Sequence, residues 1–397
     1  MAILALFAAF TLAGCGGGDA QDASLSPSSS TQASPSASTP SSPSPAASPI
    51  GVAPIDVDGS LVVVRKEGER WTLWRVSPSK ATEERFGELP FEPADAACSP
   101  DQRRIAYLKA SWPSRGWRRA LAIVDVGTGK VRWPTLRGTG LRAVDAMTWL
   151  SSSELLVSGP VPMGHASPED DRLFVVDVAS YELSSFRYLR GTEPSAARAV
   201  GEVVYRRLKT LEETEDGPLV REELVLHDVD TGSESTALGA DYIIYAAGNA
   251  YERPVVSPDA RYVLAAETGS DPSVRWDLWS VADGERLWSR SMLRVSPLLG
   301  AWDWPGRWLA FWAMPARRWA RAIVWVYDVE RGRFVRSERL AKGLLVTGRG
   351  WSDRGALAVS LRAYTSKPPV DTVLVAKNGS PKAFTLLCSG ALPVWVD

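Results

Sequence analysis

Few residues of this chain have types and spacings that favour chemistry. Histidine is the usual acid–base catalyst and a common metal ligand, yet the 397 residues include only His165 and His227, far apart in the sequence. They form no HExxH spacing, and the sequence has no Gly-x-Ser-x-Gly nucleophile motif and no phosphate-binding glycine loop. Asp56–Ser60 begins like a calcium loop but lacks the later Glu, which favours a hairpin turn. We therefore expect no catalytic residues, no metal and no cofactor.

The chemistry that the sequence does favour is lipidation of Cys15. An apolar run from Met1 to Ala13 is too short to span a bilayer but has the length of a signal-peptide hydrophobic region. Leu12-Ala13-Gly14-Cys15 resembles the bacterial lipobox, in which the cysteine becomes the lipidated mature N-terminus. The resemblance implies a signal peptide over residues 1–14. It also implies an extracytoplasmic protein held to a bacterial membrane by this lipid alone.

The segment after Cys15 has the composition of a linker. No charged residue occurs from Ala23 to Ile55, and Ser, Pro, Ala and Thr dominate. Such a segment cannot bury enough apolar surface to offset its chain entropy. We therefore predict a lipidated cysteine and disordered linker over residues 15–53 and a folded domain over residues 54–397.

An internal repeat organises the folded part. A hydrophobic–polar–hydrophobic triplet, often followed by Gly-containing turn residues, recurs about every fifty residues. Upstream of each triplet stands a second pattern, such as Ser99-Pro100-Asp101 before Ile105-Ala106-Tyr107. Each unit is therefore predicted to contain four strands. A repeat of about fifty residues with four strands is typical of a propeller blade. The triplets are centred on Arg75, Asp125, Asp177, Asp228, Ser280, Asp328 and Ala376.

The Ser-Pro-Asp turns followed by Ile-Ala-Tyr strands resemble TolB-like propellers and their WD-repeat relatives. The family pattern adds a glycine after the Asp, where this chain has Gln102, Ala260 and Arg354. The resemblance covers residues 54–397 and implies an all-β fold, a seven-bladed β-propeller of four-stranded antiparallel blades. The segment 392–397 could complete the blade that contains Leu61–Val64, although Ile55–Asp58 could take the same place. If the tail crosses into that blade, Cys98 and Cys388 could approach and form a disulfide.

Most of the 17 tryptophans are expected to fill the wedges between blades. Asp125, Thr128-Gly129 and Trp133 also resemble the tryptophan-docking motif of quinoprotein-type propellers, and Asp283-Gly284 with Trp288 is a partial second copy. This likeness supports an alternative function, that of a quinoprotein-like propeller lipoprotein in outer-membrane protein assembly. The tryptophans expected at wedge positions include Trp71, Trp74, Trp276, Trp279 and Trp325.

Two basic, aromatic loops are the candidate partner-binding residues. Both connect a second to a third strand, so we expect them on one face of the disc, and Arg and Trp are enriched at binding hot spots. The alternative is that they are solvated loops whose arginines pair with nearby carboxylates. Acidic segments at 168–171 and 211–216 occupy the equivalent loop in two other blades. The loop residues are Trp112, Arg115, Trp117, Arg118 and Arg119 in one blade, and Arg317, Arg318, Trp319 and Arg321 in another.

Charge limits the partners. With 45 basic and 46 acidic residues the net charge is −1, which does not favour nucleic acid. A face carrying both signs of charge suits an envelope protein or a polyanionic glycan. We expect a monomeric binding or scaffold module of the cell envelope with no chemistry of its own. The alternative from another class is a propeller enzyme, a hydrolase or lyase with its site in the central funnel.

Overall fold

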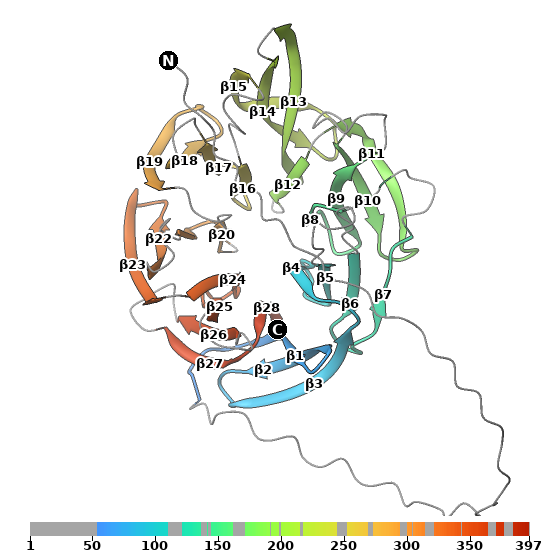
Figure 1. Cartoon of the computed structure of the whole chain (residues 1–397), viewed down its shortest axis with the longest axis vertical. Coiled ribbons are helices and arrows are strands. Elements are labelled where there is room, and N and C mark those ends of the chain that lie inside the picture. Colours follow the sequence, from blue (N-terminus) through green and yellow to red (C-terminus); the bar gives the residue numbers. More distant parts are fainter. Residues whose placement is uncertain are drawn as a thin grey trace, which may run out of the picture. The chain divides into compact units, whose positions relative to one another are not determined.

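Every regular element of the described chain is a β-strand, and no membrane-spanning helix occurs in this part of it. The computed structural model describes residues 54–396 except for 110–120, 136–140, 142–143, 162–170, 191, 198–199, 215–216, 244–251, 269–272, 294–299, 304, 314–320, 343, 364–370 and 377–383. The strands form seven separate four-stranded antiparallel sheets, the blades, arranged in a ring (Figure 1). The predicted fold class, a seven-bladed β-propeller, is confirmed.

The blades follow one another along the chain, each built from the innermost strand outwards. Blade 1 contains β28 (Ala391–Val396), β1 (Ser60–Glu67), β2 (Arg70–Ser77) and β3 (Thr82–Leu89). Blade 2 contains β4 (Pro93–Cys98), β5 (Arg104–Lys109), β6 (Leu121–Asp125) and β7 (Val131–Arg132). Blade 3 contains β8 (Ala146–Trp149), β9 (Glu154–Pro160), β10 (Asp171–Asp177) and β11 (Glu182–Arg190).

The remaining four blades have the same order of strands. Blade 4 contains β12 (Thr192–Ala197), β13 (Glu202–Thr214), β14 (Gly217–Asp228) and β15 (Glu234–Ile243). Blade 5 contains β16 (Glu252–Val256), β17 (Tyr262–Thr268), β18 (Ser273–Ser280) and β19 (Arg286–Leu293). Blade 6 contains β20 (Gly300–Trp302), β21 (Trp308–Ala313), β22 (Arg321–Asp328) and β23 (Arg333–Lys342). Blade 7 contains β24 (Leu344–Trp351), β25 (Leu357–Ala363), β26 (Asp371–Ala376) and β27 (Thr385–Ser389).

The C-terminal strand closes the ring. β28 pairs with β1 in blade 1, with Trp395 opposite Leu61 and Val394 opposite Val62. The innermost strands of neighbouring blades are in contact all the way round, including β24 with β28 and β28 with β4. The segment 55–58, the other candidate for this place, forms no strand, and Val57 instead packs into the core between blades 7 and 1.

The hydrophobic cores lie between neighbouring blades. Side chains alternate along a strand, so each strand sends one set toward the preceding blade and the other toward the next. Val62 and Val64 of β1 pack with Tyr107 of blade 2, whereas Leu61 and Val63 pack with residues of blade 7. Because both faces of a blade are covered, second strands such as β1 and β5 are nearly continuous buried apolar runs, whereas the outermost strand β3 is largely polar.

The repeated Ser-Pro-Asp turns share one geometry. The Ser99 hydroxyl donates to Asp101 Oδ1 at 2.6 Å and accepts the Arg104 backbone N–H at 3.0 Å. Ser257 makes the same two bonds, to Asp259 at 2.6 Å and from the backbone N–H of Tyr262 at 3.0 Å. The next residues, Gln102 and Ala260, have φ angles of 58° and 57°, the left-handed region that explains a glycine there in the family pattern.

Tryptophans act in two ways at the joints between blades. Trp71 and Trp276 are buried as expected, and Trp74, Trp279 and Trp325 are half-buried. In a second set, which has the same pattern in the sequence, each indole N–H donates to a backbone carbonyl of the preceding blade's innermost strand. These bonds run from Trp149 to Ala97, Trp302 to Val255, Trp351 to Ala301 and Trp395 to Gly350, at 2.9, 3.0, 3.1 and 3.1 Å.

Cys98 and Cys388 are thiols in this structure, so the disulfide considered from the sequence is not formed. Cys388 belongs to the core between blades 7 and 1, whereas Cys98 packs against the core between blades 1 and 2. Closure of the ring by β28 therefore leaves the two cysteines in separate cores, on opposite sides of blade 1.

Candidate functional site

Most of the predicted site residues lie outside the described part of the chain. Besides Cys98 and Cys388, the exception is Arg321, whose backbone begins β22. The loops that carry the others are placed by the strands at their ends. One loop joins β5 to β6 in blade 2, and the other joins β21 to β22 in blade 6. The residues outside are Cys15, Trp112, Arg115, Trp117, Arg118, Arg119, Arg317, Arg318 and Trp319.

The topology gives these two loops equivalent positions. In both blades the loop connects the second strand to the third, and the strands have the same order in each sheet. The propeller repeat therefore puts both connections at the same end of their blades. The hairpin of β13 and β14 is the equivalent connection in blade 4.

The hairpin of blade 4 differs from all the others in length. β13 and β14 have 13 and 12 residues, whereas the second and third strands of the other blades have 5 to 8. The expectation of a loop over residues 211–216 is therefore wrong for Leu211–Thr214, which continue β13. Thr214 lies opposite Gly217, and β15 continues the pairing as far as Leu219 opposite Ile243. We call this extension, from Arg207 to Glu223 with the facing part of β15, the ribbon (Figure 1).

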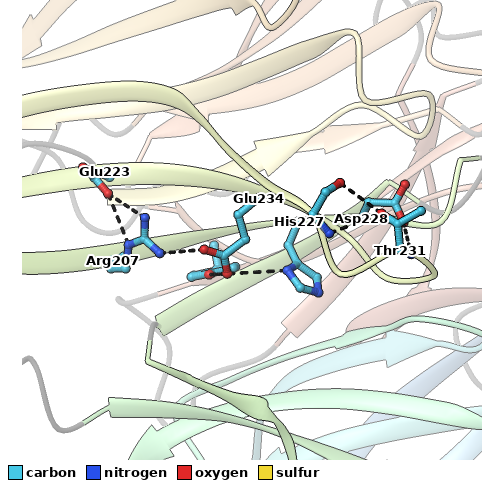
Figure 2. A network of polar contacts seen from close by, with 8 residues as sticks. Arg207, Glu223, His227, Asp228, Thr231 and Glu234 are labelled. Atoms are coloured by element: carbon cyan, nitrogen blue, oxygen red, sulfur yellow. Dashed lines mark hydrogen bonds and ion pairs between the residues drawn. The ribbon is translucent and has the colours of Figure 1, made fainter.

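A polar network that is partly buried lies at the base of the ribbon (Figure 2). The Arg207 guanidinium donates to Glu223 Oε2 at 2.8 Å and to Glu234 Oε2 at 2.9 Å. The Tyr205 hydroxyl donates to the other oxygen of Glu234 at 2.7 Å, and Nδ1 of His227 lies 3.5 Å from that oxygen. Three neighbouring strands thus contribute to one chain of contacts.

The charges of this network stabilise one another. Burial acts to raise the pKa of Glu234, but the hydrogen bonds from Tyr205 and Arg207 outweigh it and lower this pKa below its ordinary 4.5. Burial raises the pKa of the Tyr205 phenol, and the hydrogen bond to Glu234 raises it further. Tyr205 therefore stays protonated and remains a donor, and Glu234 stays ionised as its acceptor.

Register explains why these side chains meet. Arg207 lies opposite Glu223, and His227 lies opposite Glu234, so all four point to the same face of blade 4. That face packs against blade 3, where Phe186 meets the His227 ring edge-on with centroids 5.4 Å apart. His227 lies in a strand, as expected, but its partners come from positions that no local sequence motif connects.

This arrangement is suited to holding elements together. His227 is 1% exposed and Glu223 9%, whereas the side chains of Arg207 and Glu234 remain 31% and 28% exposed. Within the described residues no group of three or more His, Cys, Asp or Glu side chains is placed to hold a metal ion. The network fixes the ribbon to the rest of blade 4 and to blade 3.

The docking-like motif of blade 2 forms a capped turn. Asp125 accepts hydrogen bonds from the backbone N–H and the hydroxyl of Thr128, at 2.8 and 2.7 Å, and these bonds lower the pKa of its carboxyl. Gly129 has a φ of 69°, and a Cβ there would overlap the carbonyl oxygen of Phe86 in blade 1. Trp133 is 45% exposed and contacts Phe91 with ring centroids 5.4 Å apart.

The partial second copy behaves differently. Trp288 of blade 5 packs against blade 6, with ring centroids 5.4 Å from Phe311 and 5.1 Å from Phe334. Asp283 accepts a hydrogen bond from the Ser280 hydroxyl at 2.9 Å, and Gly284 has a φ of 62°. The two copies therefore share the turn but not the environment of the tryptophan.

Comparison with known proteins supports the fold. No family model matches the chain, and no curated protein matches it. The propeller domain of the Trilobed protease from Pyrococcus furiosus is similar at 12% identity, with a TM-score of 0.52, over 83% of this chain and 93% of that one. A prolyl endopeptidase structure is similar at 12% identity and a TM-score of 0.51, over 84% of this chain. This chain spans half, 50%, of that endopeptidase chain.

TolB from Acinetobacter baumannii is also among the similar structures. It matches at 15% identity with a TM-score of 0.44, over 85% of this chain and 66% of the TolB chain. At such identities the likenesses concern the propeller architecture.

Proposed function

We propose that this protein is a lipid-anchored, extracytoplasmic propeller that binds a partner in the cell envelope through one face. The observation that carries the proposal is the equivalent placement of three connections, those of blades 2, 4 and 6, at the same end of their blades. Loops at one end of a rigid scaffold are where binding residues concentrate. The face opposite carries the tight turns between third and fourth strands.

The composition of the three connections supports a charged partner. The segments 112–119 and 317–321 supply arginines and tryptophans, whereas Glu212 and Glu213 lie near the tip of the ribbon in blade 4. Separated patches of opposite charge select orientation and partner more than they add affinity. A protein with its own two signs of charge, or a polyanionic glycan on the basic side, suits this face.

The anchor in this proposal is the lipid on Cys15, and the spacer is the segment 15–53. The lipobox-like sequence and the uncharged, Ser- and Pro-rich composition support it. A Pro-rich segment of this length can extend to about 120 Å, whereas a flexible coil would average about 30 Å. The anchored propeller could thus reach partners that lie well away from the membrane surface.

Proximity crosslinking in native cells followed by mass spectrometry tests the proposal. The first comparison is between wild type and a Cys15→Ala form without its anchor, which should leave the membrane fraction. The second removes the basic face with the substitutions Arg115→Ala, Trp117→Ala, Arg118→Ala, Arg317→Ala and Trp319→Ala. We expect one reproducible envelope partner, lost with these five changes.

The matched control removes three positive charges from the opposite face. Lys80, Lys130 and Arg333 are exposed and lie at tight turns between third and fourth strands. Their replacement by alanine should leave the partner in place. Equal loss in both variants, or crosslinks only to scattered neighbours in wild type, would overturn the proposal and turn attention to enzymatic turnover.

A further inference from the structure

We propose that the ribbon of blade 4 is a docking edge for an extended, basic segment of a partner protein. The inference rests on the proposed binding role but concerns a surface separate from the Arg- and Trp-rich loops. The open edge of β13 carries it. β12 pairs with β13 only as far as Thr192 opposite Arg206, so from Arg207 to Thr214 no described strand pairs with that edge.

This open edge is specific to blade 4. In the other six blades the pairing of the first strand reaches to within three residues of the end of the second strand. In blade 4 the whole of 207–214 continues beyond it, while its other edge is paired with β14 except at Leu211, where the register shifts. Unpaired N–H and C=O groups along such an edge are a template for one more strand.

The base of the ribbon is held rigidly, which favours docking. Arg207 and Glu223, the first register pair beyond β12, are also the pair that the polar network fixes to Glu234. The ribbon is three strands wide there, because β14 pairs with β15 as far as Leu219. A partner strand would therefore meet a preformed edge, which lowers the entropic cost of binding.

The residues along the edge indicate the chemistry of the partner. Glu212 and Glu213 lie on β13 itself, and Glu215 and Asp216 follow in the sequence before β14 begins. Leu211 lies between Lys209 and this acidic end of β13, and it is 40% exposed. Arg207 and Lys209 lie on the same edge, but Arg207 is paired with Glu223 and Glu234. From 207 to 223 the sequence has six acidic and three basic residues, so the ribbon favours a basic segment over a polyanion. Aliphatic residues that alternate with the basic ones would suit Leu211.

The probe is a fluorescent ten-residue peptide that alternates Lys with Val and Thr, with binding to the full chain measured by anisotropy. Two matched peptides separate the contributions. One carries N-methyl groups on consecutive amides, which blocks both of its edges so that it cannot add as a strand, and the other has Glu in place of every Lys. We expect the first peptide to bind, and each of the others to bind at least about tenfold more weakly.

Two variants locate the binding on the ribbon. Lys209 lies opposite Arg221, so replacement of residues 210–220 by Asn-Gly makes an ordinary two-residue hairpin and removes the edge. This variant should lose at least about tenfold in affinity. The double variant Glu212→Lys with Glu213→Lys keeps the edge and should reverse the preference, so that the Glu peptide binds better than the Lys peptide.

Three results would overturn the inference: binding that survives N-methylation, binding that survives removal of residues 210–220, or a charge preference that the double variant does not change. Such results would show that the charged residues protect this edge from pairing and that no partner strand binds to it. The failure of the proposed function is distinguishable, because it would appear as absence of a crosslinked partner in cells whatever the peptide does. Conversely, partner capture that the loop substitutions abolish while the peptide fails to bind would leave the proposed function standing alone.

Discussion

The indole N–H of Trp395, on the last strand of the ring, donates a hydrogen bond to the carbonyl oxygen of Gly350 in blade 7, at 3.1 Å. Gly350 is suited to this contact because a Cβ there would lie 3.0 Å from the carbonyl oxygen of Pro393 and 3.4 Å from Cδ1 of Trp395. The closing strand is therefore fixed to both its neighbours, by ladder pairing to β1 and by this bond to β24.

Replacement of Trp395 by Phe tests how much that hydrogen bond contributes to the free energy of unfolding. Trp276 is the matched control, because it is equally buried and its indole nitrogen has no hydrogen-bond acceptor within the described residues. Both substitutions lose packing, but only Trp395→Phe also loses a hydrogen bond, so it should lower the free energy of unfolding by about 1–2 kcal/mol more. Urea titrations of both variants give the difference. Equal costs would mean that the bond does not stabilise the closure.

Ala81 is a position where a glycine should stabilise the fold. It is exposed in the turn between β2 and β3 and has a φ of 51°. An L-residue there carries a cost of about 1–2 kcal/mol, partly offset because glycine gains more freedom in the unfolded chain. Ala81→Gly should therefore raise the free energy of unfolding by roughly 0.5–1 kcal/mol, measured by chemical denaturation.

Gly129 gives the opposite case. It also has positive φ, at 69°, but a Cβ would overlap the carbonyl of Phe86 as well. Gly129→Ala should destabilise the protein strongly, since both strain and a clash between blades arise. A neutral Gly129→Ala would contradict the close contact of blades 1 and 2 at this turn.

The network at the base of the ribbon predicts a dependence of stability on pH. The folded-state pKa of Glu234 is below its ordinary 4.5, so ionised Glu234 contributes stability above that pH. This contribution is lost as the pH falls through the lower, folded-state pKa. Glu234→Gln should therefore destabilise the protein at neutral pH and flatten part of its acid-side loss of stability, as followed by thermal unfolding.

Glu84→Gln is the control for this effect, because the Glu84 side chain is 70% exposed. It should leave the profile close to that of wild type. If stability changed with pH in the Glu234→Gln variant as it does in wild type, the Glu234 carboxyl would not be the group that makes the stability of this network depend on pH.

Cys388 should be unreactive in the folded protein. Burial is the main cause that raises the pKa of its thiol to about 12, so almost no thiolate exists at mildly alkaline pH. We expect iodoacetamide to modify Cys388 quickly in urea and far more slowly in the native state, as located by peptide mass spectrometry. The exposed neighbour Ser389 supplies the control, since Ser389→Cys in a Cys388→Ala background should react readily. Fast native labelling of Cys388 would show that blade 7 opens.

The triplets were sufficient to predict the blades because they mark a fixed place in each one. Asp125, Asp177, Asp228 and Asp328 are each the last residue of a third strand, and three of them accept a hydrogen bond from the backbone N–H of the residue three positions on. Turn chemistry of this kind is local, so it is visible in the sequence. The need for a closing strand was predictable, because a ring with an incomplete first blade leaves an apolar strand unpaired. The choice between the segments 392–397 and 55–58 was not predictable from the sequence.

The blade 4 site could not be predicted in the same way. Leu211–Thr214 are polar enough to suggest a loop, and their pairing depends on the register with β14 rather than on their own propensity. Tyr205 and Arg207 of β13 meet Glu234 of β15 because the pairing of both strands with β14 brings them to one face, and no spacing in the sequence indicates this. The indole N–H hydrogen bonds between blades could not be predicted, because a tryptophan that is only buried and one that is also hydrogen-bonded have the same hydrophobic pattern in the sequence.

Closure by β28 also determines when the molecule can become complete. Blade 1 holds only β1, β2 and β3 until β28 arrives, although these three strands precede all the other blades in the sequence. Contacts between such distant segments form slowly, since a long loop must close before they stabilise anything. The ring therefore forms only after its last residues are available, and a chain stalled before Ala391 would expose the apolar edge of β1 to other partially made copies.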